Sequence, residues 1–528
     1  MKYIIKITDR ARQIIEGLSF RQLINQVCCP MFPKEREKSI DEFGAMFFHA
    51  YEREYLIENI KAFKELCKIP PFIVSDLECG AGRMVLGATK FSSMMALSQT
   101  NSVELAYKTG KIAAEEAGEI GYNWTFAPVA DLAFDKDNPV VSTRSAGKEP
   151  EHVIKMVGAY MRGLQENGMM ATIKHFPGDG YGSYDQHLTT PENPLDMDSW
   201  WKYSGRVFKE LIEEGAMAVM PGHISLPAYD EINVELNMYP PATLSKRILL
   251  DLLRGELGFE GLIVSDAINM GGAVGFMNYY DACAAALENG CDCLLFPKID
   301  ENFYIEMENQ IKAGKLTIQT LKDRAARIVA MKEQIGLLDG SFEKNIITVD
   351  KEINKKVSDS VVENSITVVR DRKGIIPFNI YKDTKVLYLV IMNNHDRYTE
   401  MYEGMKNELK RFSDNITFMV HPGPDALFAA VYKKEFDLVI CSIGSRLSYG
   451  LNVVRLHDEI ARNMMGGWTK LGTPVIFVSH FHPFIHKEYE ASIDTIINTY
   501  DNTDYTPKCI VEGITGSRVL KREVFVQD

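Results

Sequence analysis

Five ionisable residues stand at or near the ends of apolar runs that are typical of buried strands. They are Asp76, Lys174, His175, His223 and Asp266. A carboxylate in such a place can act as a nucleophile, and a lysine or histidine can bind oxygen atoms or transfer protons. A single polar residue at a strand end is often structural, but five of them predict a shared pocket.

A second candidate group lies in the glycine-rich loop after His175, at residues 176–191. There Asp185 precedes His187 by two positions. In an extended segment, an aspartate at this spacing can accept the hydrogen bond of the histidine Nδ1, which fixes the tautomer and raises the basicity of the ring. Such a histidine suits general acid/base chemistry near neutral pH, although Asp-x-His alone is a weak signal.

The apolar runs that carry these residues favour a barrel. Eight runs occur in the first 300 residues without polar alternation, and amphipathic helical patterns, such as 152–168 and 246–258, separate many of them. Such runs indicate parallel strands covered by helices. Eight of them predict a TIM-type (β/α)8 barrel, whose active site is built at the carboxyl ends of its strands. The runs are 27–32, 43–48, 71–76, 124–131, 170–176, 217–223, 261–266 and 291–297.

A second series of apolar runs follows a polar, charged stretch at 341–358. These runs also alternate with helical patterns, which favours a smaller α/β sandwich with helices on both faces of an open sheet. The sequence therefore predicts a barrel domain at 1–340, a linker at 341–358 and a second domain at 359–528. The runs are 365–370, 385–392, 416–420, 437–443, 473–479 and 493–500.

The bulk properties narrow the classes of partner. A chain of 528 residues can hold two domains, and a net charge of -13 argues against nucleic acid or an anionic membrane as the main partner.

Nine cysteines without zinc-site spacing indicate reduced thiols, and the N-terminus has no signal-peptide pattern, so we expect a cytoplasmic protein. No cofactor or metal is expected, and the oligomeric state stays open. His480, His482 and His486 favour a loop role over a metal site.

Three stretches resemble glycoside hydrolase family 3, in its β-N-acetylglucosaminidase (β-hexosaminidase) branch. KHFPGDGYGSYDQH (174–187) is similar to the signature K-H-F-P-G-x-G-x(4)-D-x-H. ATLSKRILLDLLRGELGFEGLIVSDAINM (242–270) is similar to the block that leads to the family's nucleophile, in the motif S-D-x-x-x-M. NWTFAPVADLAFDKDNPVVSTRS (123–145) resembles the N-F-A-P-V-x-D and N-P-x-x-x-x-R-S stretch.

The resemblance implies an exo-acting, retaining hydrolase that removes terminal N-acetyl-β-glucosaminyl groups from a small carbohydrate. It implies that Asp266 is the nucleophile and forms a glycosyl-enzyme, and that His187, oriented by Asp185, is the acid/base. The residues implied to bind the sugar hydroxyl and acetamido groups are Asp76, Arg144, Lys174, His175 and, less directly, His223.

Two departures from the family pattern and three other functions stay open. Two extra residues lie between Asp76 and Arg83, which leaves the role of Arg83 undecided, and Asp179 stands where the family often has histidine. A β-glucosidase or β-xylosidase of the same family is one alternative, although those enzymes usually take the acid/base carboxylate from the second domain. Phosphorolysis is another, because a neutral histidine does not repel phosphate. The third is a sugar-binding protein without catalysis.

Overall fold

The computed structural model describes residues 1–33, 41–342, 350–446, 450, 454–465 and 467–526. They form two compact units, each of which gathers separate parts of the chain. The first unit comprises Met1–Lys90, Val103–Val141 and Glu149–Lys355. The second comprises Phe91–Ser102, Ser142–Lys148 and Lys356–Asp528. Two short segments from the first third of the chain therefore pack with the C-terminal part.

The first unit is a ring of eight parallel strands. One sheet has the order β1-β10-β9-β8-β7 and another the order β2-β4-β6. Parallel bridges from Met31 to Phe47 and from Trp124 to Met170 join the edges of these two sheets. The TIM-type barrel is thereby confirmed. Its strands are β1 (Cys28–Cys29), β2 (Ala45–Phe47), β4 (Phe72–Ser75), β6 (Trp124–Thr125), β7 (Thr172–Phe176), β8 (Ala218–Pro221), β9 (Leu262–Ala267) and β10 (Cys293–Leu295).

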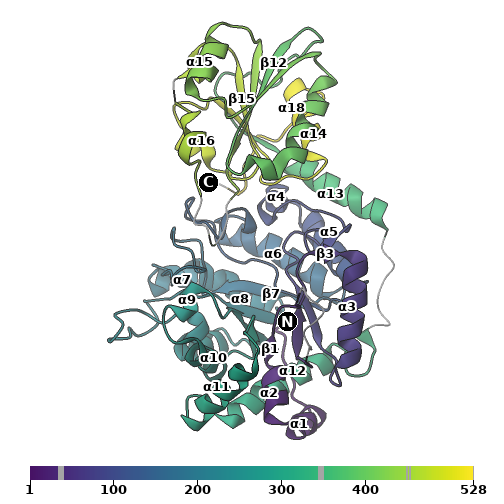
Figure 1. Ribbon diagram of the computed structural model, residues 1–528, viewed down its shortest axis with the longest axis vertical. Coiled ribbons are helices and arrows are strands. Elements are labelled where there is room, and N and C mark those ends of the chain that lie inside the picture. The colour runs from purple at the N-terminus through teal and green to yellow at the C-terminus, as the bar shows by residue number, and fades with distance from the viewer. Residues whose placement is uncertain (34–40, 343–349, 447–449, 451–453, 466, 527–528) are drawn as a thin grey trace. The chain divides into compact units, whose positions relative to one another are not determined.

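Helices follow the strands along the chain and cover the outside of the ring (Figure 1). This cover explains the unbroken apolar runs, because both faces of each strand are buried. In β4, for example, the neighbouring residues Phe72 and Ile73 point to opposite faces and both are buried. The helices of the first unit are α1 (Asp9–Glu16), α2 (Phe20–Gln26), α3 (Arg53–Leu66), α5 (Val103–Gly118), α6 (Pro150–Gln165), α7 (Met197–Lys202), α8 (Ser204–Glu213), η2 (Ala242–Leu244), η3 (Arg247–Glu256), α9 (Gly271–Val274), α10 (Tyr279–Asn289), α11 (Glu301–Lys312) and α12 (Ile318–Gln334).

Two details of the barrel go beyond the sequence patterns. The helix expected at 246–258 forms as η3, which has π-type rather than α-type hydrogen bonds. A small parallel pair, β3 (Tyr51–Glu52) with β5 (Val85–Leu86), lies outside the ring order.

The second unit is an open sheet between two helical layers. Five parallel strands have the order β16-β15-β14-β12-β13, and β11 adds to β16 in the antiparallel sense. Along β12, Val386 and Tyr388 join one apolar core, whereas Leu387 and Leu389 join the core on the opposite face. The strands are β11 (Thr367–Asp371), β12 (Lys385–Met392), β13 (Asn415–Val420), β14 (Leu438–Gly444), β15 (Val475–Ser479) and β16 (Thr495–Asn498).

Figure 1 shows α14 and α18 on one side of this sheet and α15 and α16 on the other. The α/β sandwich is therefore confirmed as the second architecture. Its helices are α4 (Met94–Gln99), η1 (Ser142–Arg144), α13 (Lys351–Ser365), which begins in the first unit, η5 (His395–Tyr398), α14 (Thr399–Lys410), α15 (Pro424–Tyr432), α16 (Asp458–Arg462), η6 (Trp468–Lys470), α17 (Ile485–Glu488) and α18 (Thr506–Thr515).

The expected linker at 341–358 falls partly outside the described residues, because 343–349 are among those not described. Residues 351–358 belong to α13. The domain limits 1–340, 341–358 and 359–528 therefore stay a prediction. Within the described chain, no helix has both the length and the apolar character needed to cross a membrane.

Candidate active site

The carboxyl ends of the barrel strands hold most of the candidate residues. Asp76 directly follows β4, Lys174 and His175 lie on β7, and Asp266 lies on β9. His223 comes two residues after β8. Because parallel strands present their carboxyl ends at one face of a barrel, the fold brings these five residues to that face.

Asp266 is an ionised carboxylate held beside a histidine. Its Oδ1 accepts a hydrogen bond from the Ala267 N–H group at 2.7 Å, and its Oδ2 lies 4.0 Å from His175 Nε2. Burial alone would raise the pKa of Asp266, but the side chains of His175 and His223, helped by a backbone N–H group, hold it below its usual value. Asp266 can therefore serve as a nucleophile at neutral pH.

Asp185 and His187 form a hydrogen-bonded pair in the loop after β7. His187 Nδ1 lies 2.7 Å from Asp185 Oδ1, and the His187 N–H group donates to the same oxygen at 2.8 Å. The Asp185 side chain is fully buried, whereas that of His187 is 27% exposed. An ionised carboxylate can only accept, so Nδ1 carries the proton and Nε2 is the ring nitrogen available for proton transfer.

Lys174 is a buried cation between two carboxylates. Its Nζ lies 3.0 Å from Asp76 Oδ1 and 2.8 Å from Glu78 Oε1. Only 5% of the Lys174 side chain is exposed, but 32% of the Asp76 side chain is, which leaves the Asp76 carboxylate able to accept hydrogen bonds from a ligand. We did not predict Glu78 as a site residue, although its place two positions after Asp76 in an extended segment was an available signal.

Asp131 is a second site residue that the sequence analysis missed. This buried carboxylate lies 2.6 Å from His175 Nδ1 through Oδ2 and accepts from the His175 N–H group at 3.1 Å through Oδ1. Val129 forms a parallel bridge with Lys174, which places the two segments side by side. Asp131 thus orients His175 as Asp185 orients His187. Its place at the end of run 124–131 was the available signal.

Asp179 is buried at the start of the catalytic loop, here defined as residues 177–191. Its Oδ1 accepts hydrogen bonds from Asn138 Nδ2 at 2.9 Å and from the Gly180 N–H group at 2.6 Å. Burial, with the nearby charge of Asp131, raises the pKa of Asp179 to about 6. Asp179 therefore faces the protein interior and not the solvent.

His223 is fully buried, and its ring contacts the backbone next to Asp266. Its Nε2 lies 3.0 Å from the carbonyl oxygen of Ala267, the residue after Asp266. A carbonyl can only accept, so Nε2 carries the proton and the ring is neutral unless Nδ1 is protonated too. Burial lowers the pKa of His223, which keeps it neutral near pH 7.

Two further arginines lie on other segments of the chain. Arg144 lies on η1, in a segment that belongs to the second unit, whereas the other seven predicted site residues lie in the first. Arg83 lies in a turn just before β5. The structure therefore brings together Asp76, Lys174, His175, His223 and Asp266 at one face of the barrel, with the Asp185–His187 pair in the loop after β7.

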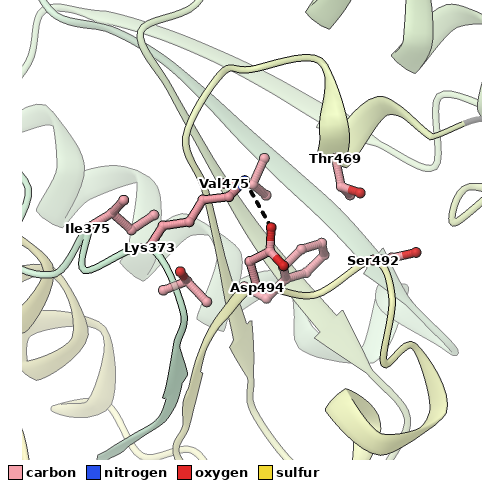
Figure 2. A pocket seen from close by; sticks show the side chains of 8 residues that line it. Lys373, Ile375, Thr469, Val475, Ser492 and Asp494 are labelled. Atoms are coloured by element: carbon pink, nitrogen blue, oxygen red, sulfur yellow. Dashed lines mark ion pairs between the residues drawn. The ribbon is translucent and has the colours of Figure 1, made fainter.

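The second unit carries a small surface pocket beside β15 and β16, whose lining includes Thr469, Val475 and Ser492 (Figure 2). Lys373 Nζ and Asp494 Oδ2 form an ion pair of 2.9 Å there. None of the predicted site residues lines this pocket.

The histidine cluster His480, His482 and His486 of the second unit is buried. His480 Nε2 lies 2.9 Å from Ser442 Oγ, and His482 and His486 are 2% and 4% exposed. In the part of the chain that the structure describes, no three His, Cys, Asp or Glu side chains are grouped so that they could hold a metal ion.

Comparison with known proteins identifies the family. The model of the glycosyl hydrolase family 3 N-terminal domain matches residues 39–331. The chain is 28% identical to a β-N-acetylglucosaminidase/β-glucosidase of Cellulomonas fimi over 482 residues, which are 87% of this chain and 84% of that protein.

Solved structures agree on the two-part architecture. A β-glucoside phosphorylase, BglX, superposes with a TM-score of 0.90 at 26% identity, over 100% of this chain and 98% of that one. A family 3 β-N-acetylglucosaminidase of Paenibacillus sp. FPU-7 superposes with a TM-score of 0.80 at 23% identity, over 96% and 98%. The chain therefore belongs to glycoside hydrolase family 3 and is a glycosidase of that family.

Proposed function

We propose that this enzyme is a retaining, exo-acting β-N-acetylglucosaminidase with Asp266 as nucleophile and His187 as acid/base. The observation that carries the proposal is the joint presence of an ionised strand-end carboxylate and a histidine already oriented by a buried aspartate. Retaining hydrolysis needs these two kinds of group, one on each side of the bond to be broken.

The reaction has two steps. Asp266 attacks the anomeric carbon while the Nε2–H group of protonated His187 gives its proton to the departing glycosidic oxygen, so the C–O bond breaks and a glycosyl ester forms. A water molecule then gives a proton back to His187 Nε2 and attacks the same carbon, which frees Asp266 with net retention. Asp185 stabilises the imidazolium through Nδ1 in the first state.

Sugar recognition is assigned to the charged groups around Lys174. Asp76 can accept from sugar hydroxyl groups, and His175 presents Nε2 toward Asp266 because Asp131 holds its other nitrogen. Charge-assisted hydrogen bonds of this kind bind and orient hydroxyl groups. We include Arg144 and His223 as binding residues from the family motif.

The N-acetyl preference is supported by the name of the Cellulomonas fimi relative, which also names a β-glucosidase. The test compares release of p-nitrophenol from the β-N-acetylglucosaminide and the β-glucoside by the wild type and Asp266→Asn. We expect faster turnover of the N-acetyl sugar and loss of activity in the variant. A preference for the glucoside would transfer the proposal to β-glucosidase action.

A second candidate is transfer of the sugar to phosphate instead of water. The full-length likeness to a β-glucoside phosphorylase favours it. After the first step His187 is neutral and, unlike a carboxylate, does not repel an incoming phosphate. Turnover with and without inorganic phosphate, followed by ³¹P NMR, separates the two: a glycosyl phosphate identifies phosphorolysis, and free sugar alone identifies hydrolysis.

We also infer a cytoplasmic location. Support comes from the nine cysteines, all of which are unpaired thiols.

A further inference from the structure

The catalytic loop is tied to the barrel on both sides of its acid/base histidine. The Gly271 N–H group donates to the carbonyl of His187 at 2.9 Å, and the Gly272 N–H group donates to the carbonyl of Gln186 at 3.1 Å. Both glycines belong to the segment that follows β9, the strand of Asp266. The backbone that carries His187 is therefore attached to the backbone that follows Asp266.

The side chain of Gln186 adds a third attachment. It is fully buried, although it stands between Asp185 and the partly exposed His187. Its Oε1 accepts from the His223 N–H group at 2.8 Å, just after β8. This leaves the amide Nε2 to face Asp179 Oδ2 at 3.5 Å, so one side chain spans from β8 to the start of the catalytic loop.

Three glycines make room for this docked backbone. A Cβ atom added at Gly271 would lie 2.5 Å from the carbonyl oxygen of Leu188, and one at Gly272 would lie 2.7 Å from that of Gln186. A Cβ atom at Gly222 would lie 2.9 Å from Gln186 Oε1. The contacts at Gly271 and Gly272 are with backbone oxygens and are closer than a Cβ atom tolerates, so the fit depends on the absence of side chains at these two positions. At Gly222 the added atom would meet the end of the Gln186 side chain.

We infer that Gln186 is a positioning residue for the acid/base. It fixes the backbone of the catalytic loop, so that His187 is already placed to protonate the leaving group before substrate binds. The inference rests on the proposed function of His187. A general acid must lie within hydrogen-bond reach of the departing oxygen, and a displacement of about 1 Å can cost ~100-fold in rate. Gln186 itself is buried and acts through the loop.

The leaving group of the substrate provides the test. The phenol of a phenyl glycoside needs the proton from His187 to depart, whereas the 2,4-dinitrophenolate of a dinitrophenyl glycoside departs without one. For Gln186→Ala we expect kcat/KM on the phenyl glycoside to fall about 10- to 100-fold, with little change on the dinitrophenyl glycoside. His187→Ala provides the reference and should show the same selectivity with a larger loss.

Glycine variants give a matched second test that does not alter Gln186. Gly272→Ala would push against the docked loop, whereas Gly182→Ala lies in the same loop with nothing within 4 Å of the added atom. We expect Gly272→Ala to reproduce the selective loss on the phenyl glycoside and Gly182→Ala to behave as the wild type. Thermal melting of each variant shows that it is folded.

The inference is overturned if folded Gln186→Ala and Gly272→Ala lose activity equally on both glycosides, or on neither. If Gln186→Ala does not fold, Gly272→Ala decides alone. A different pattern marks failure of the proposed function: His187→Ala would then show no selective loss on the phenyl glycoside.

Discussion

Two histidines of the site each contact a buried aspartate through Nδ1, but their Nε2 atoms lie in different surroundings. His175 is held by Asp131 and turns Nε2 toward Asp266 at 4.0 Å. His187 is held by Asp185 and keeps part of its ring exposed. The first pair therefore suits binding beside the nucleophile, and the second suits proton exchange with a leaving group and water.

Replacing Asp185 by Asn tests the orientation of His187. An amide at this position can donate to Nδ1, which would place the ring proton on the wrong nitrogen, and the imidazolium would lose its counter-charge. We expect kcat/KM on a phenyl glycoside to fall by about 10²- to 10⁴-fold. Steady-state kinetics check this, with Asp198→Asn on the exposed face of α7 as the control. Wild-type rates for Asp185→Asn would remove the dyad from the mechanism.

Asp179 makes the stability of the protein depend on pH. Its pKa of about 6 in the folded protein lies above the ordinary aspartate value of 3.8, so the folded state binds more protons between these values. The free energy of unfolding contributed by this group is therefore present below about pH 4 and is lost as the pH rises through 6. Asp179→Asn should flatten this fall.

Urea unfolding of the wild type and Asp179→Asn at several pH values between about 4 and 7 measures the effect. The quantity of interest is the difference between the two proteins, because other carboxylates titrate in the same range. A difference that does not change with pH would contradict the raised pKa.

At the scale of the elements, the eight strands of the barrel could be predicted because their apolar runs are unbroken. Each predicted run, from 27–32 to 291–297, coincides with one barrel strand, and only β9 extends beyond its run, by one residue. The polar strand ends could be predicted for the same reason, since Asp76 and Asp266 interrupt these runs abruptly. The apolar runs therefore predict the strands, and the polar residues that end them predict where the site residues lie.

Features that depend on tertiary pairing were not predicted. Asp131 reaches His175 only because Val129 bridges to Lys174 across 45 residues of chain. Arg144 shares a motif with the barrel stretch 123–145, yet its segment packs with the second unit. Hydrophobic periodicity carries no signal for such pairings, because the partners are far apart in the sequence.

A buried ion cluster lies at the amino ends of β9 and β10, whereas the candidate active site lies at the carboxyl ends of the strands. Asp292, just before β10, is fully buried, with Arg254 Nη2 at 2.9 Å and Arg327 Nε at 3.1 Å. Arg324 Nη1 lies 3.6 Å away, and the Ile263 N–H group at the start of β9 donates to Asp292 at 2.9 Å. This carboxylate therefore neutralises cations from η3 and α12.

Asp292→Asn should destabilise the barrel, because three arginines would lose their shared counter-charge. We expect a loss of about 3–5 kcal/mol in the free energy of unfolding, measured by urea denaturation. Asp323→Asn on the exposed side of α12 is the control. Since Asp292 lies at the amino ends of the strands, the folded fraction should keep its kcat/KM, and an unchanged unfolding midpoint would contradict the structural role.

At the scale of the whole molecule, the chain combines a barrel that carries the candidate chemistry with a sandwich of open-sheet type. In the described chain, seven of the eight predicted site residues belong to the barrel unit. The acid/base candidate comes from a barrel loop, so the proposed chemistry can be tested on the intact protein without assigning a role to the second unit.

The proposed mechanism requires that Asp266 forms a covalent bond to the sugar. The most direct measurement incubates the protein with a 5-fluoroglycosyl fluoride of the preferred sugar, whose glycosyl-enzyme hydrolyses slowly, and then determines the intact mass and the labelled peptide. We expect one sugar per protein, attached to Asp266 and absent from Asp266→Asn. A sugar attached to any other residue, or turnover without any covalent adduct and with inversion at the anomeric carbon, would contradict it.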